Sequence, residues 1–201
     1  MASRSLFATQ FYQGALGDEA LLADLDAACR DLAREDRAGA AWSRAHGYRG
    51  YTSYASLNDL PQRAPAFAAA KRMLDRHVAG FARDCGFDLA GRRLRLDSLW
   101  ANVMKPGGAH SGHLHPHSTV SGTLYVAVPP GSGALRLEDP RLAMMMAAPT
   151  RLADAPEALR PFIYAEPQPG TIFLWESWLR HEVMPSTAKA ERISLSFNYR
   201  W

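Results

Sequence analysis

The 201-residue chain contains few cysteines and no long apolar segment. Its two cysteines, Cys29 and Cys85, cannot build a disulfide framework, and each lies in a helical apolar stripe, so we expect two reduced thiols in the core. No apolar run approaches the roughly 18 residues that span a bilayer, and residues 1–10 lack the continuous apolar region of a secretory signal. These absences favour a cytoplasmic protein that does not contact a membrane.

The sequence also lacks a concentration of charge of either sign. The formal net charge is +3, and the lysines and arginines stand singly among the acidic residues. Proteins that bind nucleic acid usually carry a basic patch or stripe, so we expect no nucleic-acid partner. Charged residues make up 21% and hydrophobic residues 47% of the chain, a balance that allows a chain of this length to bury a substantial core.

Hydrophobic periodicity divides the chain into a helical first part and a strand-rich second part. Apolar residues recur at three- to four-residue spacing over residues 21–32 and 67–85, which predicts two amphipathic helices. From residue 94 the period becomes two, most clearly over residues 193–201. Helices followed by many short strands predict an α+β fold, with helices packed on one side of an antiparallel sheet or barrel. We expect a single domain over residues 1–201, helical to about residue 90 and built of strands from about residue 91.

A cluster of histidines carries the first chemical signal. Four of the seven histidines, His110, His113, His115 and His117, lie within eight residues between two predicted strands. A His-x-His pair on an extended chain places both imidazoles on one face, where they can bind one metal ion at about 2 Å. A solvated loop has no chemical reason to prefer histidine, so the cluster predicts a metal site. Its spacing allows either His113 with His115 or His115 with His117.

A metal site needs a further ligand, and a cosubstrate needs an anchor. His181 follows the aromatic stretch Trp175–Trp178 and is the candidate for the distal ligand. Arg192 and Ser194 share the polar face of the last predicted strand. An arginine facing into an enclosed barrel is costly unless it meets an anion, and its planar guanidinium matches a carboxylate with two hydrogen bonds.

This order of motifs resembles that of the 2-oxoglutarate- and Fe(II)-dependent oxygenases. In that pattern a His-x-(acid or His) pair is followed by a distal histidine and, about ten residues later, by Arg-x-Ser. More narrowly, residues 100–201 resemble a bacterial subfamily of these oxygenases. The matching pieces are Trp100-Ala-Asn102-Val, Pro106-Gly107, His113-Leu-His115-Pro116, Ser121-Gly122-Thr-Leu-Tyr125-Val, Leu137-Glu-Asp139-Pro140-Arg141, Pro169-Gly170, Ser177-Trp178-Leu-Arg-His181-Glu-Val-Met-Pro185 and Arg192-Ile-Ser194-Leu-Ser-Phe-Asn198.

The resemblance implies a double-stranded β-helix, a jelly-roll or cupin-like barrel, flanked by the N-terminal helices. It also implies Fe(II) and 2-oxoglutarate as cofactors and hydroxylation of a substrate as the reaction. The metal ligands that it implies are His113, His115 and His181. The residues that it implies for 2-oxoglutarate are Arg192 and Ser194 at the distal carboxylate, with Tyr125 and Asn102 as further contacts.

The sequence departs from the family pattern at His115, which stands where an acidic ligand is usual. Three neutral imidazoles leave the charge of a divalent metal uncompensated by the protein, although bound 2-oxoglutarate would supply negative charge. Glu138, Asp139 or Glu182 could instead fold in as a ligand, and His117 could replace one of the histidines.

Two other functional classes are compatible with the histidine cluster. One is a cupin-like metalloenzyme with three histidines that does not use 2-oxoglutarate, and the other is a metal-binding barrel without catalytic activity. Against the cupin interpretation, a cupin motif has a glutamate shortly after its histidine pair, and this chain has Thr119 and Val120 there instead. The pair Arg192 and Ser194 favours the oxygenase.

The sequence does not identify the substrate, a small molecule or a peptide. We expect Tyr54 and Trp178 to contact it, since both are aromatic residues near the matching motifs. Residues 140–168 are rich in Met, Ala and Pro and show no period, which predicts a loop or lid. An uncovered edge strand would allow a homodimer.

Overall fold

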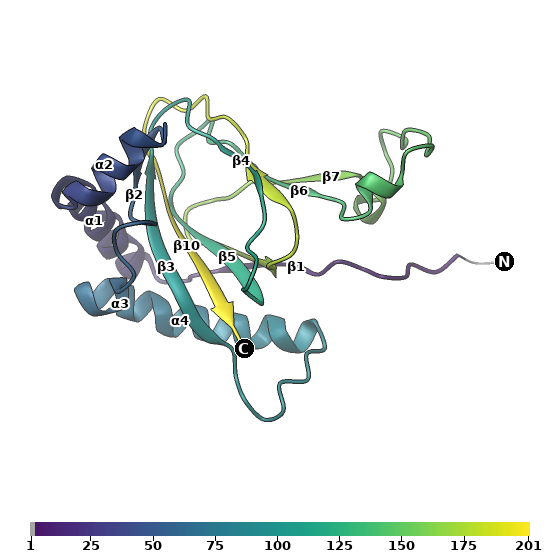
Figure 1. Ribbon diagram of the computed structural model, residues 1–201, viewed down its shortest axis with the longest axis horizontal. Coiled ribbons are helices and arrows are strands. Elements are labelled where there is room, and N and C mark those ends of the chain that lie inside the picture. The colour runs from purple at the N-terminus through teal and green to yellow at the C-terminus, as the bar shows by residue number, and fades with distance from the viewer. Residues whose placement is uncertain (1–2) are drawn as a thin grey trace.

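The computed structural model describes residues 3–201, which form four α-helices and ten β-strands (Figure 1). The helices are α1 (Glu19–Glu35), α2 (Arg37–Ala45), α3 (Leu60–Arg63) and α4 (Pro65–Asp84). The strands are β1 (Phe11–Ala15), β2 (Gly50–Thr52), β3 (Arg95–Met104), β4 (His110–His113), β5 (Val120–Ala127), β6 (Leu135–Glu138), β7 (Phe162–Ala165), β8 (Thr171–Glu176), β9 (His181–Val183) and β10 (Arg192–Arg200). Two short 3-10 helices, Leu142–Met144 and Glu157–Leu159, lie between β6 and β7.

The two predicted helices are confirmed as α1 and α4. The side chain of Asp18 accepts a hydrogen bond from the backbone N–H of Leu21 at 2.9 Å, which caps the N-terminus of α1. Pro65 opens α4 at a position where its missing N–H costs nothing. Of the two cysteines, Cys29 is buried on α1 and Cys85 is half-buried, and both thiols are free. Within residues 3–201, no helix is both long enough and apolar enough to cross a membrane.

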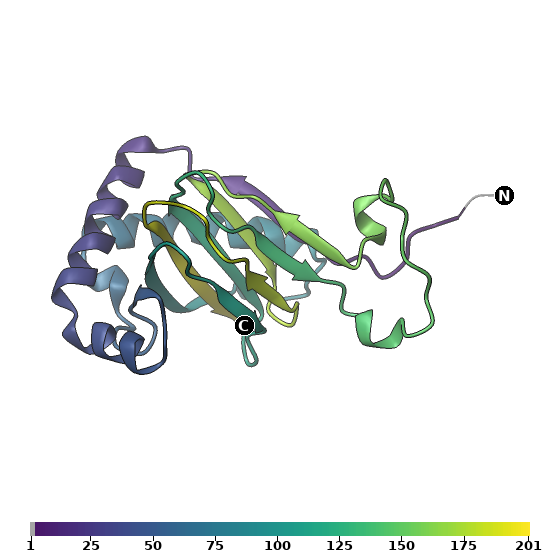
Figure 2. The same ribbon diagram turned by 90° about the horizontal axis from the view of Figure 1, so that it is seen from above.

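The strands form two antiparallel sheets. The larger sheet has six strands in the order β1-β8-β5-β10-β3-β2, and the smaller has four in the order β4-β9-β6-β7. Helices α1 and α4 pack on the larger sheet, and Figure 2 shows the helices gathered on one side of the strands. This is the α+β arrangement of helices and antiparallel strands that the change of period predicts.

Strand β10 separates the hydrophobic core from the interior space between the sheets. Its apolar residues, which include Ile193 and Phe197, are fully buried in the cluster that joins the larger sheet to the helices. The alternating residues, from Arg192 to Asn198, face a cavity instead of bulk water. A second apolar cluster, which includes Tyr125, Leu137 and Trp175, joins the two sheets. The polar face of β10 is therefore enclosed.

Two side chains attach α2 and the turn after β2 to the rest of the fold. Asp36 caps α2 by accepting from the Gly39 N–H at 2.9 Å, and it also accepts from the hydroxyls of Tyr51 at 2.9 Å and Ser56 at 2.5 Å. Burial disfavours the charge on Asp36, but these hydrogen bonds outweigh it and hold the pKa of its carboxyl below the ordinary value. The hydroxyl of Ser43, which is fully buried, accepts a hydrogen bond from the backbone N–H of Thr52, the last residue of β2.

We predict that Asp36→Ala destabilises the protein by about 1–3 kcal/mol, because the change removes a helix cap and the acceptor of two hydroxyls. Chemical denaturation at pH 7 measures this loss. The lowered pKa of Asp36 means that its stabilising contribution is present above the pKa of the unfolded chain and decreases as the pH falls through the folded-state value. The difference between the variant and the wild type should therefore shrink in acid.

The matched control is Asp31→Ala, which removes an exposed carboxylate on α1 that pairs with Arg34. Such a surface pair contributes roughly 0–1 kcal/mol. An equal loss of stability in the two variants would contradict the role of Asp36.

Candidate metal centre

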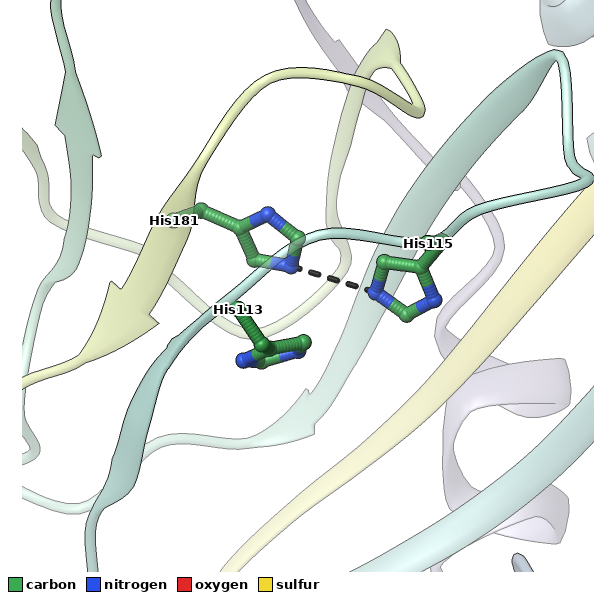
Figure 3. A group of neighbouring side chains, drawn as sticks. All are labelled: His113, His115 and His181. Atoms are coloured by element: carbon green, nitrogen blue, oxygen red, sulfur yellow. Dashed lines mark hydrogen bonds between the residues drawn. The ribbon is translucent and has the colours of Figure 1, made fainter.

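Three histidines from two paired strands and one loop converge on a single point (Figure 3). His113 ends β4 and lies opposite His181, the first residue of β9, in the antiparallel register. His115 follows two residues later, where its backbone N–H donates to the Ser177 carbonyl at 3.0 Å. One nitrogen of each imidazole lies within 4.8 Å of the others. Three nitrogens this close to one another can bind one transition metal ion, to which each histidine nitrogen would lie at about 2 Å.

The orientation of two of these rings is fixed by backbone carbonyls. Nδ1 of His181 lies 2.9 Å from the Leu179 carbonyl, and Nδ1 of His113 lies 2.7 Å from the Ser111 carbonyl. A carbonyl only accepts, so each Nδ1 donates a proton and leaves Nε2 with a free lone pair. Nε2 of His181 faces Nε2 of His115 at 3.2 Å. The tautomers thus point lone pairs towards the centre of the triad.

Burial keeps the imidazoles of His115 and His181 neutral. With a smaller contribution from neighbouring histidines, it lowers the pKa of His115 to about 4 and that of His181 to about 3. Metal ligands must be deprotonated, so a site with such low pKa values retains its ligand form at neutral pH. The residues present therefore fit a divalent metal.

The triad opens into a cavity of about 960 Å³ that extends between the sheets. Arg192 lines this cavity and is only 3% exposed. Its Nη1 donates to the Gly133 carbonyl at 3.1 Å, while its buried Nε has no hydrogen-bond partner among residues 3–201. A buried guanidinium without an anionic partner is costly. The cavity therefore contains a donor suited to a carboxylate group.

The other residues predicted to bind the cosubstrate surround Arg192. Ser194, Tyr125 and Asn102 all line the same cavity, and all are buried. The guanidinium carbon of Arg192 lies 5.6 Å from the centre of the Tyr125 ring. The side-chain amide of Asn102 donates to Ser196 Oγ at 3.1 Å, so it is held in place from the next strand.

The acidic residues considered as alternative ligands are engaged elsewhere. Glu138 pairs with Arg180 at 3.3 Å, Glu182 with Arg136 at 2.7 Å, and Asp139 with Arg141 at 2.8 Å. Within the described chain, the group of ligand atoms contains His113, His115 and His181 and none of these carboxylates. His117 is exposed and has a positive φ of 73°, and it lines the cavity away from this group.

The two aromatic residues proposed to contact substrate have different surroundings. Tyr54 lines the cavity and is 60% exposed. Trp178 is 46% exposed, lies outside the lining of the cavity, and donates from its indole nitrogen to Glu176 at 2.6 Å. The cavity also has lining residues that the sequence did not assign to a site, among them Tyr48 and Trp100. No periodic pattern marks Tyr48, since it precedes the strand-rich part.

A family model described as "Putative 2OG-Fe(II) oxygenase" matches residues 98–198, which include all three histidines and Arg192. The chain belongs to this family. Part of the oxygenase lies outside the match, including α1, α2, β2 and α4. No match is found among curated proteins.

Solved structures show that the fold of this oxygenase recurs. A prolyl-4-hydroxylase from Pseudomonas putida is 23% identical, with a TM-score of 0.64 over 96% of this chain and 94% of that one. HygX from Streptomyces hygroscopicus, crystallised with nickel and 2-oxoglutarate, is 15% identical, with a TM-score of 0.61 over 96% and 82% of the two chains. The epimerase SnoN, in complex with Fe3+, alpha ketoglutarate and nogalamycin RO, is 13% identical, with a TM-score of 0.65 over 96% and 79%.

We predict that His181→Ala abolishes retention of Fe(II) or Zn(II) after desalting, because it removes one of three ligands from the point where they converge. Metal analysis of the purified protein measures this. The matched control is His117→Asn, which removes a histidine outside the triad and keeps a residue type that tolerates positive φ. Unchanged metal content in His181→Ala would show that the metal binds elsewhere.

Proposed function

We propose that this protein is an Fe(II)- and 2-oxoglutarate-dependent oxygenase that hydroxylates a C–H bond of its substrate. One observation carries the proposal: three histidines converge in a cavity that also contains a buried arginine with an unpartnered Nε. The histidines suit a metal, and the arginine suits the carboxylate of a cosubstrate. The family membership of residues 98–198 supports the same activity.

The proposal includes the finer architecture. We infer that the two antiparallel sheets form a double-stranded β-helix within a single domain, with α1 and α4 supporting the larger sheet. The strand order of the larger sheet interleaves early and late strands, so β10 lies between β5 and β3. This arrangement supports the inference because it brings Arg192 and the triad, which are far apart in sequence, into one cavity.

His113, His115 and His181 would hold the metal. With three neutral ligands, the protein supplies no negative charge to a divalent ion. 2-Oxoglutarate carries two carboxylates. One of them would offset half of the charge of the ion, while Arg192 would balance the distal carboxylate. The absence of an acidic ligand therefore makes the charge of the site depend on the cosubstrate, and metal binding and cosubstrate binding should reinforce each other.

Arg192, Ser194, Tyr125 and Asn102 would hold 2-oxoglutarate. When bound, iron and 2-oxoglutarate supply the redox chemistry, with the net reaction 2-oxoglutarate + O2 + R–H → succinate + CO2 + R–OH. The protein contributes binding, orientation and exclusion of water. Arg192 is anchored by the Gly133 carbonyl, and its buried Nε has no partner among residues 3–201, which leaves this donor for a carboxylate. The burial of Tyr125 raises the pKa of its phenol, which keeps the hydroxyl protonated as a donor.

The experiment that tests the activity is an anaerobic titration of the Fe(II)-loaded protein with 2-oxoglutarate. A saturable visible charge-transfer band is expected, since a 2-oxo acid that chelates Fe(II) produces one. Succinate release in air would then measure turnover. If iron is bound and no band appears, the protein does not use 2-oxoglutarate and the proposal is wrong.

We predict that Arg192→Ala weakens 2-oxoglutarate binding about ten- to hundredfold, the effect of losing a charge-assisted hydrogen-bonded pair. Iron content should be largely unchanged, because Arg192 is not a metal ligand. The control is Arg95→Ala, which removes an exposed arginine on the neighbouring strand β3, outside the lining of the cavity. If Arg192→Ala loses iron and 2-oxoglutarate to the same extent, the variant is misfolded or Arg192 has a structural role.

A further inference from the structure

Aromatic rings continue from the metal triad to the rim of the cavity. The ring centroids of His115 and Trp100 are 6.0 Å apart, those of Trp100 and Tyr54 are 5.3 Å apart, and those of Tyr54 and Trp42 are 6.2 Å apart. His46 stacks on Trp42 at 4.1 Å with an interplanar angle of 16°. All of these residues line the same cavity. We refer to Trp42, Tyr54 and Trp100 as the aromatic wall.

Tyr54, the most exposed residue of the aromatic wall, lies on a turn that is held firmly, whereas Trp100 is only 8% exposed. Tyr54 is 60% exposed, although its turn is fixed by hydrogen bonds on both sides. Ser53 exchanges two bonds with Ala101 of β3, each 3.0 Å long, and Ser56 donates to Asp36. A tyrosine ring usually stabilises a fold by burying its apolar surface against its neighbours. Here the backbone of the turn is fixed, but most of the surface of the Tyr54 ring stays exposed over the cavity.

The angles within the wall favour a flat ligand. The planes of Tyr54 and Trp100 meet at 69°, so one ring presents its edge where the other presents its face. A flat ring placed in this corner can stack on one ring and point its own edge at the face of the other, the two preferred geometries of aromatic pairs. Because Trp100 is next to His115, such a ring would lie beside the metal triad.

The charges around the cavity disfavour a cation. Asp97 is the only carboxylate among the described residues that line it, and Asp97 pairs with Arg200 at 3.2 Å. The lining also holds Arg192, and the proposed metal would add positive charge. Aromatic faces attract cations in other proteins, but here no free acid accompanies them.

We propose that the aromatic wall binds the substrate, and that the substrate carries a flat, uncharged ring whose C–H bond, or one next to it, is presented to the metal site. This proposal rests on the proposed function, since the oxygenase chemistry gives the wall its role. The wall comes in part from α2 and the turn after β2, outside the region matched by the family model. It therefore concerns the specificity of this chain. The cavity has room for a drug-sized molecule beside 2-oxoglutarate.

The test uses the full-length protein with Zn(II) in place of iron and saturating 2-oxoglutarate, which prevents turnover. Three probes of similar size are titrated by calorimetry: 2-naphthol, which is flat and neutral; decahydro-2-naphthol, which is saturated; and 2-naphthylmethylamine, which is cationic at pH 7. We expect 2-naphthol to bind most tightly and the cation at least tenfold more weakly. Binding of the cation or of the saturated alcohol as tight as that of 2-naphthol would overturn the proposal.

The variants locate the binding. Tyr54→Ala should weaken 2-naphthol binding roughly three- to tenfold, the effect expected for loss of one aromatic contact. Tyr54→Phe should retain it. The control Tyr164→Ala removes a tyrosine of similar exposure, 54%, on β7, and should have no effect. Equal binding by Tyr54→Ala and the wild type would overturn the proposal.

Metal and 2-oxoglutarate binding are measured on the same variants. If both are normal and 2-naphthol still does not bind the wild type, the aromatic wall is not a ring-binding site while the oxygenase proposal stands. If 2-oxoglutarate itself fails to bind the wild type, the proposed function is wrong. With Co(II) in the site, paramagnetic broadening of the 2-naphthol proton signals should place the ring near the triad. Saturable binding without such broadening would mean that the probe binds elsewhere.

Discussion

The enclosure of the polar face of β10 is the constraint on which the site depends. One face of this strand completes the apolar core beneath the helices, so the opposite face must cover a cavity between the sheets. Arg192 is thereby taken out of water with one donor satisfied by Gly133 and Nε unpaired. A buried charge in that position is energetically costly unless an anion binds to it. The fold thus forms a site suited to a carboxylate before any cosubstrate is bound.

The sequence predicts the parts of this arrangement that repeat along the chain. The apolar stripes of α1 and α4 and the alternation in β10 are local patterns, and each is confirmed as an element. The histidine cluster was predictable because four histidines lie within eight residues, and the pairing of β4 with β9 then places His113 opposite His181. The preference for His113 over His117 came from the family resemblance, since spacing alone allowed both. In the structure His117 sits at a positive φ outside the ligand group.

Other features depend on contacts that no local pattern reveals. Strand β2 has three residues, and its place at the edge of the larger sheet depends on its pairing with β3. Glu138 and Glu182 could be excluded as ligands only once their arginine partners were seen across neighbouring strands. The segment at 140–168 was expected to be a loop or lid that could hold a short helix near residues 156–160. It contains two 3-10 helices, one of them at Glu157–Leu159, and also β7, whose pairing with β6 is a tertiary property. The β-propensity of a segment does not identify the strand or side chain with which it pairs.

The structure separates the residues suited to chemistry from those suited to recognition. The triad and Arg192 lie within the matched region, whereas Trp42 and Tyr54 lie on α2 and a turn that Asp36 and Ser43 attach to the core. These attachments involve none of the proposed metal ligands. A wall held in this way does not need metal to form, so little ordering should accompany ligand binding, and preorganisation of this kind favours affinity. Changes in α2 and this turn could therefore alter which substrate is accepted while the metal and cosubstrate contacts stay the same.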